Sequence, residues 1–268
     1  MQSPESKNMT LKNLSRNSRF YILVFSFLLS IFLLTLTRLQ VTSDQLFYIR
    51  LQQQYGLLSI LFWYFALIIS PLGYAIGKQR MKHFEFARRA IGVSAAYFAA
   101  LHVGVALWGQ LGGVSQLAYL PTTYVWSLLF GSIALLTLLV MAATSFDKVI
   151  RFMTFKRWKW LHRLVYGAGV LVIIHIWMIG THVTYSGVQI AALIALIILA
   201  GLETFRIVTL MTKEHLELRA KKHFAAVFLI IWLFFISFIL NLPNTIQNYN
   251  DRHTPKSQSS SHSGGHHE

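Results

Sequence analysis

Residues 161–181, which read LHRLVYGAGVLVIIHIWMIGT, decide the fold. Apart from the histidines His162 and His175, this stretch contains one ionisable cation, Arg163, and is otherwise largely apolar. One helix needs about 20 largely apolar residues to cross about 30 Å of hydrocarbon. The stretch therefore predicts a membrane-spanning helix that carries a histidine in its interior.

The same pattern recurs along the whole chain of 268 residues, of which 55% are hydrophobic. Only 12% are charged, whereas soluble domains average about 25%. Six further apolar runs lie at 20–37, 57–77, 90–108, 122–145, 187–210 and 224–242. The sequence therefore predicts an all-α integral membrane protein, a bundle of about seven transmembrane helices.

The basic residues alternate between the two ends of the predicted spans. Twenty of the 24 Lys and Arg residues lie in the N-terminal region and in every second connection, and the four others are Arg38, Arg50, Arg252 and Lys256. This bias predicts a cytoplasmic N-terminus in a cell (inner) membrane. The net charge of +15 would indicate a nucleic-acid partner in a soluble chain, but here it follows the topology, so we expect membrane lipid and no nucleic acid.

Cysteine is absent, which excludes disulfides, thiolate catalysis, iron–sulfur clusters and cysteine-bound zinc. No small-x-small cleavage pattern follows the first span, so we expect an uncleaved anchor helix. The predicted segments are a cytoplasmic tail at 1–18, an extra transmembrane helix at 19–38, a core at 55–210, a cytoplasmic loop with the last transmembrane helix at 211–242, and a disordered outside tail at 243–268.

Two histidines lie inside the third and fifth spans. Ionisable side chains are expensive in a bilayer, so each is a candidate functional residue. His102 lies about 20 Å along its helix from Arg89, and His175 lies about 22 Å from Trp160, so the two share one depth. Two neutral imidazoles at one depth are what a bis-histidine haem iron requires, whereas zinc would need further ligands. The alternative is that each histidine only bonds a neighbouring helix or lines a water cavity.

His162 lies thirteen residues before His175, so on an undistorted helix the two do not face the same neighbour. The Arg88–Arg89 pair of the third span lies at its depth. Further cations surround His162, namely Lys156, Arg157, Lys159 and Arg163. Such a rim can hold a quinone headgroup, a flavin phosphate or the propionates of a second haem, although topology requires the same cations.

One carboxylate, Glu203, falls inside the sixth span. Arg206 follows three residues later on the same helix. Residues at this spacing are neighbours on a helix surface, which predicts an ion pair within the helix.

Several short motifs match a known family. They are RRAIG at 88–92, ALH at 100–102, KRWKWLHRLVY at 156–166 with His175 beyond it, and SPL at 70–72. Together they resemble the ferric-reductase-like transmembrane domain family, within it the MsrQ (YedZ) branch of haem-binding subunits. The resemblance covers roughly residues 55–210.

The resemblance implies an electron-transfer subunit with a b-type haem, one haem or alternatively two, and with FMN or quinone as a further cofactor. It implies that His102 and His175 are the axial ligands of the haem iron and that His162 is linked to a haem. Arg88, Arg89 and Arg163 are the further cofactor-binding candidates, and no residue is assigned a catalytic role.

The resemblance also implies the direction of electron flow. Electrons would come from a cytoplasmic flavin reductase or a membrane quinol, because the chain has no nicotinamide or flavin domain of its own. They would pass to an extracytoplasmic acceptor, in the MsrQ-like case a molybdopterin protein-methionine-sulfoxide reductase. Two alternatives remain open: a stand-alone ferric or cupric chelate reductase, and a non-redox helical transporter or scaffold.

Overall fold

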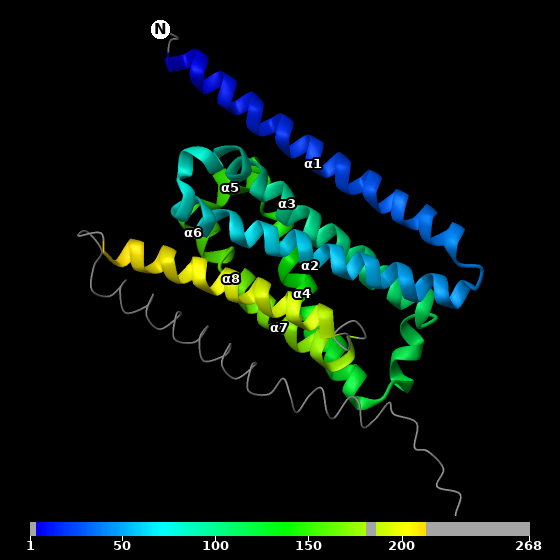
Figure 1. Cartoon of the computed structure of the whole chain (residues 1–268). Coiled ribbons are helices and arrows are strands. Elements are labelled where there is room, and N and C mark those ends of the chain that lie inside the picture. Colours follow the sequence, from blue (N-terminus) through cyan, green and yellow to red (C-terminus); the bar gives the residue numbers. More distant parts are fainter. Residues whose placement is uncertain (1–3, 181–185, 213–268) are drawn as a thin grey trace, which may run out of the picture.

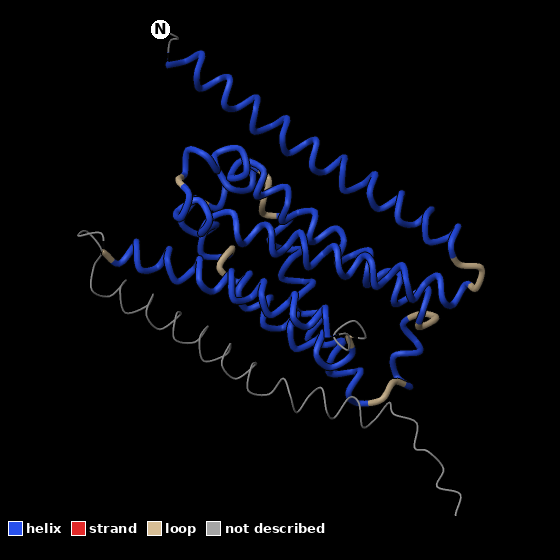
Figure 2. Tube along the Cα trace, in the orientation of Figure 1, coloured by secondary structure: helices blue, strands red, loops and turns tan. Residues whose placement is uncertain are grey.

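The computed structural model describes residues 4–180 and 186–212, and this part of the chain is helical without a strand (Figure 2). The long helices are α1 (Pro4–Gln40), α2 (Asp44–Ile76), α3 (Lys78–Gly104), α4 (Thr122–Ala143), α7 (Leu164–Ile179) and α8 (Ser186–Met211). Four short helical segments connect them, namely the π-helix η1 (Val105–Gln110), the 3₁₀-helix η2 (Val114–Tyr119), α5 (Asp147–Met153) and α6 (Phe155–Leu161).

Among the residues that the structure describes, six helical segments are long and apolar enough to cross a membrane. They are Ser18–Gln40, Asp44–Ile76, Lys78–Gln110, Thr122–Ala143, Phe155–Ile179 and Ile190–Leu210. These confirm the first six predicted spans and make the chain a multi-pass membrane protein. The predicted seventh span at 224–242 and the tail at 243–268 lie outside the described residues, and the cytoplasmic N-terminus stays a prediction.

The connections between the first three spans are shorter than the sequence predicts. Helix α2 begins at Asp44 rather than near residue 57, and α3 begins at Lys78 directly after Gly77. Gly77 has a φ of 102°, which a residue without a Cβ adopts easily, so the chain reverses within a single residue. The basic residues expected in a loop there therefore lie on the first turns of α3.

Helices α2 and α3 form the centre of the bundle (Figure 1). The extra helix α1 packs on α3 and α2, while α8 packs on α2 from the opposite side, and α4 packs on α7. Leu51, Tyr55 and Phe98 are almost fully buried between α2 and α3. Many other large apolar side chains are exposed, as expected for helices that face lipid.

Helix α1 is joined to the core by polar contacts at membrane depth. Ser26 Oγ donates to Ser94 Oγ at 2.8 Å, and Ser30 Oγ lies 2.8 Å from Tyr97 Oη on α3. Tyr55 Oη of α2 donates to the carbonyl oxygen of Ser30 at 2.9 Å. Hydrogen bonds of this kind hold helices together where lipid offers no hydrophobic driving force. The first span is therefore an integrated part of the bundle.

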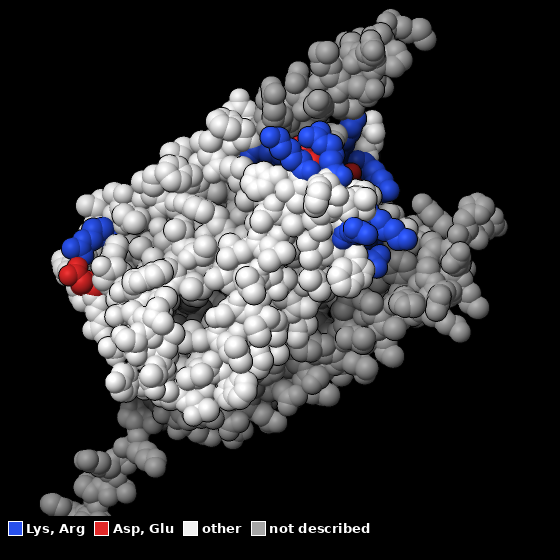
Figure 3. Space-filling view, turned by 180° about the vertical axis from the view of Figure 1, so that it is seen from behind, with Lys and Arg blue, Asp and Glu red and all other residues white. Residues whose placement is uncertain are grey.

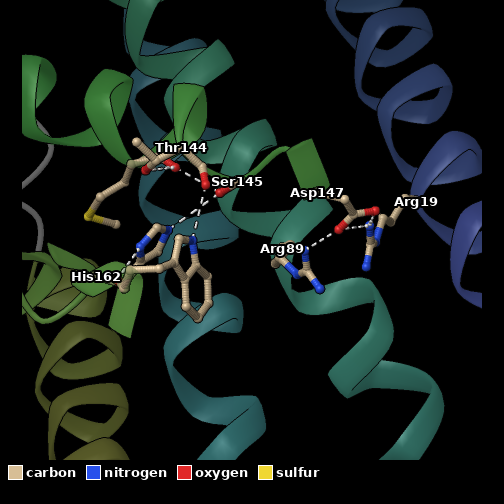
Figure 4. A network of polar contacts seen from close by, with 8 residues as sticks. Arg19, Arg89, Thr144, Ser145, Asp147 and His162 are labelled. Atoms are coloured by element: carbon tan, nitrogen blue, oxygen red, sulfur yellow. Dashed lines mark hydrogen bonds and ion pairs between the residues drawn. The ribbon is translucent and has the colours of Figure 1, made fainter. Parts of the chain in front are cut away.

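The charged side chains gather at the two ends of the bundle (Figure 3). A large group of Lys and Arg lies at one end, a small mixed group lies at the other, and the surface between them is uncharged. At the basic end Asp147, at the start of α5, pairs with Arg19 of α1 at 3.0 Å and with Arg89 of α3 at 2.7 Å (Figure 4). One carboxylate thus joins three helices.

Partial burial acts to raise the pKa of Asp147, but the hydrogen bond from Arg89 and the charges of Arg19 and Arg89 outweigh it. The pKa of this carboxyl therefore lies below its usual range. Because the pKa is lower in the folded than in the unfolded state, the pairing stabilises fully at neutral pH and is lost as the pH falls through the folded value.

We expect Asp147→Asn to lower the free energy of unfolding at neutral pH by less than about 1 kcal/mol, because exposed pairs are screened by solvent. The difference from the wild type should shrink in acid, where Asp147 is protonated in both states. Thermal unfolding in detergent between neutral and acidic pH measures it. Asp44→Asn, which removes a single exposed pair with Arg38, is the matched control. If the free energy of unfolding of Asp147→Asn stayed below that of the wild type by the same amount in strong acid, the ionised Asp147 carboxylate would not be the source of the stabilisation.

Candidate functional site

His102 lies near the end of α3 and is half-buried. Its Nδ1 lies 2.8 Å from the backbone carbonyl oxygen of Gln52 on α2. Gln52 belongs to the N-terminal part of α2, which the sequence predicts as a connection. The continuation of this helix to Asp44 therefore supplies the partner of His102.

His175 occupies the equivalent position on a second pair of helices. Its Nδ1 lies 2.9 Å from the carbonyl oxygen of Ser127 on α4 and 3.1 Å from the hydroxyl oxygen of the same residue. The Ser127 hydroxyl donates to the carbonyl oxygen of His175 at 3.1 Å. Ser127 is fully buried, so all these contacts are shielded from solvent.

The structure brings the two histidine rings together, as their matching depths predict. The ring centroids of His102 and His175 lie 6.3 Å apart, and the ring planes are nearly perpendicular at 85°. The supporting helices pack mainly on other partners, α3 on α2 and α7 on α4. The imidazoles therefore extend toward one another from two separate helix pairs.

The hydrogen bonds define which ring nitrogen carries the proton. A carbonyl oxygen can only accept, so Nδ1 of each neutral ring must donate, and Nε2 keeps its lone pair. Metal-bound histidines commonly donate their other ring N–H to a carbonyl in this way, which fixes the tautomer and the ring orientation. Each ring therefore keeps one unprotonated nitrogen, Nε2, which is the form that a metal ligand requires.

Among the described residues, the site offers two imidazoles as metal ligands. Within residues 4–180 and 186–212 no group of three or more His, Cys, Asp or Glu side chains could hold a metal ion. Zinc needs three or four protein ligands, whereas a haem iron takes axial ligands from the protein. Two metal–nitrogen bonds of about 2 Å and two distances of about 1.2 Å from a ring nitrogen to the ring centre, laid in line, add to about 6.4 Å. The ring centroids of His102 and His175 lie 6.3 Å apart. The donor set and the spacing fit a bis-histidine haem iron.

Both rings also lie against a glycine of the neighbouring helix. A Cβ at Gly56 would lie 2.9 Å from Nδ1 of His102, and a Cβ at Gly131 would lie 2.9 Å from Nδ1 of His175. Neither these glycines nor Ser127 and Gln52 could be recognised as site residues from the sequence. Isolated small or polar residues in apolar helices give no signal until the helix partners are known.

His162 lies apart from this pair, at the basic end of the bundle (Figure 4). Its Nδ1 lies 3.0 Å from the carbonyl oxygen of Trp158, and its Nε2 lies 3.5 Å from Ser145 Oγ. The His162 and Trp158 rings are 4.1 Å apart. The fifth span is interrupted here, because α6 ends at Leu161 and α7 begins at Leu164. His162 therefore lies at the break between α6 and α7.

The three predicted cofactor-binding arginines have different surroundings. Arg88 Nε donates to the carbonyl oxygen of Ala66 at 2.8 Å. Arg89 pairs with Asp147 and lies 5.9 Å from the Trp158 ring (Figure 4). The side chain of Arg163 is exposed. Arg88 and Arg89 thus belong to the interior of the basic end, and Arg163 to its surface.

The predicted Glu203–Arg206 pair is confirmed, with Glu203 Oε2 2.7 Å from an Arg206 nitrogen. The structure adds partners from other spans: Tyr166 Oη of α7 donates to Glu203 Oε1 at 3.2 Å, and Arg206 donates to Tyr166 Oη at 3.2 Å and to Ser70 Oγ of α2 at 3.4 Å. This buried cluster joins α2, α7 and α8.

Removing one partner of a buried ion pair is expected to destabilise by about 3–5 kcal/mol, because the other charge stays buried and unpaired. We therefore expect Glu203→Leu to destabilise the bundle strongly and Glu203→Leu with Arg206→Leu to recover most of the loss. A double-mutant cycle on thermal unfolding in detergent measures this coupling. Additive effects of the two substitutions would show that the pair is not coupled.

The fold and the paired histidines define a multi-pass helical membrane protein with a buried two-imidazole site. The family model described as "Ferric reductase like transmembrane component" matches residues 53–173, a range that contains His102 and His162 and ends two residues before His175. Residues 53–173 are therefore similar to ferric-reductase-like transmembrane components, as the motifs predict.

Curated relatives of one name are similar to part of this chain. The "Protein-methionine-sulfoxide reductase heme-binding subunit MsrQ" of Deinococcus radiodurans is 37% identical over 122 residues, which are 46% of this chain and 57% of that protein. The protein of the same name from Ralstonia nicotianae is 35% identical over 95 residues, 34% of this chain and 42% of that protein. In Azospira oryzae the identity is 31% over 129 residues, 46% and 52% of the two chains.

These matches make the transmembrane domain MsrQ-like. The matched region spans about half the length of the curated relatives. No solved structure matches the chain.

Proposed function

We propose that this protein is a membrane haem electron-transfer subunit whose haem iron is held by His102 and His175. The observation that carries the proposal is the pair of adjacent imidazoles. Their ring centroids lie 6.3 Å apart, and each Nδ1 is hydrogen-bonded to a backbone carbonyl oxygen. The heme-binding function in the names of its relatives supports it.

A b-type haem bound here would supply reversible one-electron chemistry at the iron. The chain's own residues perform the remaining tasks. Gln52 and Ser127 hold the two rings through Nδ1, so that Nε2 of each ring stays available as a ligand. The surrounding apolar helices exclude water, which is one of the factors that set the potential of a buried redox centre.

The position of the pair favours electron transfer toward the less basic end of the bundle. Along its span, His102 lies about 36 Å from Lys78 and about 12 Å from Gln110. With the basic end in the cytoplasm, the histidine pair lies in the outer half of the membrane. An extracytoplasmic acceptor would therefore dock close to the pair, and a cytoplasmic donor would be far from it.

The acceptor that we propose is an extracytoplasmic protein-methionine-sulfoxide reductase, because the relatives are named as subunits of such an enzyme. Reduction of one methionine sulfoxide to methionine consumes two electrons and two protons and releases one water. The subunit would deliver these electrons one at a time.

The direct test is the absorption spectrum of the detergent-purified protein, oxidised and dithionite-reduced, with the haem content measured as the pyridine haemochrome. We expect a low-spin b-type spectrum that is lost in His102→Ala and in His175→Ala, because each substitution removes one axial ligand. His83→Ala, which changes an exposed histidine of α3, is the matched control.

A colourless wild type after expression with ample haem would overturn the proposal in favour of a non-redox transporter or scaffold. About one haem per chain assigns the single site, and about two would assign a second haem to the basic end, where His162 lies. Haem retained at the wild-type level in both single variants would remove His102 and His175 from the site.

We propose that the electron donor, a quinol or a reduced flavin, binds at the basic end beside His162, Arg88 and Arg89. His162→Ala should slow reduction of the oxidised protein by about tenfold, because the donor contact is lost. The spectrum assigned to His102 and His175 should remain, because both ligands are kept. Stopped-flow reduction by a soluble quinol and by reduced FMN measures this and identifies the donor. Arg80→Ala, at an exposed cation on the first turn of α3, is the control. Equal rates in all variants with both donors would contradict this site.

A further inference from the structure

The candidate site contains the same three-part arrangement twice. On α2 the residue that accepts from His102 is Gln52, and Gly56 follows it by four positions. On α4 the residue that accepts from His175 is Ser127, and Gly131 again follows by four positions. Each histidine is therefore held by a carbonyl at one position and faces a glycine one helical turn later.

Helix geometry explains the spacing of four. In an α-helix the carbonyl oxygen of residue i accepts from the N–H of residue i+4, so the side chain at i+4 stands close to that oxygen. A second donor can reach the oxygen only if this side chain is small. At Gly56 and at Gly131 an added Cβ would come within 2.9 Å of the imidazole Nδ1, a separation that real Cβ atoms essentially never show.

This close approach is not a general property of glycines in the described helices. A Cβ at Gly92 on α3 or at Gly201 on α8 would meet no atom within 4 Å. Gly109 and Gly169 have similarly close neighbours, the rings of Tyr48 and Trp63. Glycine is otherwise unfavourable in a helix interior, so these close glycines mark places where another side chain approaches the helix. At Gly56 and Gly131 that side chain is the imidazole.

The two arrangements differ in one respect. Ser127 offers its hydroxyl oxygen to Nδ1 of His175 in addition to its carbonyl oxygen, and its hydroxyl proton is directed to the His175 carbonyl. Gln52 holds His102 through its backbone carbonyl. When an imidazole N–H donates a stronger hydrogen bond, the other ring nitrogen becomes more basic.

We propose that Gly56, Gly131 and Ser127 are positioning residues of the haem site: the glycines admit the imidazoles to the Gln52 and Ser127 carbonyls, and the Ser127 hydroxyl makes His175 the more strongly donating ligand. The inference rests on the proposed function. In it the two glycines set the positions of the imidazole rings, and Ser127 sets how strongly His175 donates relative to His102.

The test compares Gly56→Ala and Gly131→Ala with the matched controls Gly92→Ala and Gly201→Ala. We expect Gly56→Ala and Gly131→Ala to lower haem affinity by about 10–100-fold, as changes around metal ligands commonly do, or to change the ferric haem from low spin to high spin. The two controls should keep the wild-type haem affinity and the low-spin spectrum. Haem content, and the electron paramagnetic resonance spectrum of the ferric protein, measure these effects. Wild-type spectra in both glycine variants would overturn the role of the glycines.

The hydroxyl is tested by redox titration. Ser127→Ala should keep the haem and raise its reduction potential, because a less basic His175 stabilises the ferric iron less. Ser127→Thr, which keeps a hydroxyl, should return the potential toward the wild type, and Ser132→Ala, at an exposed serine of α4, should leave it unchanged. An unchanged potential in Ser127→Ala would overturn the electronic role of the hydroxyl.

A glycine variant that fails to fold is resolved by a double-mutant cycle. If the added Cβ conflicts with the ring, Gly131→Ala should destabilise the protein alone and much less in combination with His175→Ala, which removes the ring. Thermal unfolding in detergent measures this without haem. Equal destabilisation in both backgrounds would overturn the contact. A wild-type protein that binds no haem would overturn the proposed function instead. The double-mutant cycle would still show whether a Cβ at position 131 conflicts with the His175 ring.

Discussion

The hydrogen bond from an imidazole Nδ1 to a helix carbonyl, made twice at the same depth, is the interaction on which the proposed site depends. In hydrocarbon every polar group has to find its partner within the protein. A helix carbonyl oxygen already accepts one bond from its own helix and has a second lone pair available. Placing His102 and His175 against such oxygens satisfies Nδ1 and leaves Nε2 for a ligand. The helix pairs α2–α3 and α4–α7 are the scaffold for these two bonds.

The other polar groups of the bundle follow the same constraint. The serines of α1 bond to Ser94 and Tyr97 of α3, and Glu203 is paired within its own helix and with Tyr166. Charges without such buried partners gather at the ends of the helices, where water is available (Figure 3). Polar contacts at membrane depth thus fix which helices are neighbours, and the charges at the ends favour one orientation in the membrane.

The spans and the key histidines were predictable because their signals are local. An apolar run of about 20 residues is a sufficient condition for a spanning helix, and two histidines counted from equal starting points lie at equal depth. The intrahelical Glu203–Arg206 pair was predictable for the same reason, since three residues separate its members. The extent of the helices was predicted less well: polar residues such as Gln52 read as a loop, but they continue α2 beyond the apolar core.

The sequence by itself determined the class of protein, the number of its first spans and the depth of His102 and His175, because hydrophobicity and helical rise act along the chain. The tertiary structure alone decided which residues surround these histidines. Gly56, Gly131, Ser127 and Tyr166 gained a role only when their helices were packed, because a steric gap or a hydrogen bond between helices depends on rotation and neighbour choice. A linear pattern of apolar residues does not encode either quantity, since every face of a lipid-embedded helix is similarly apolar.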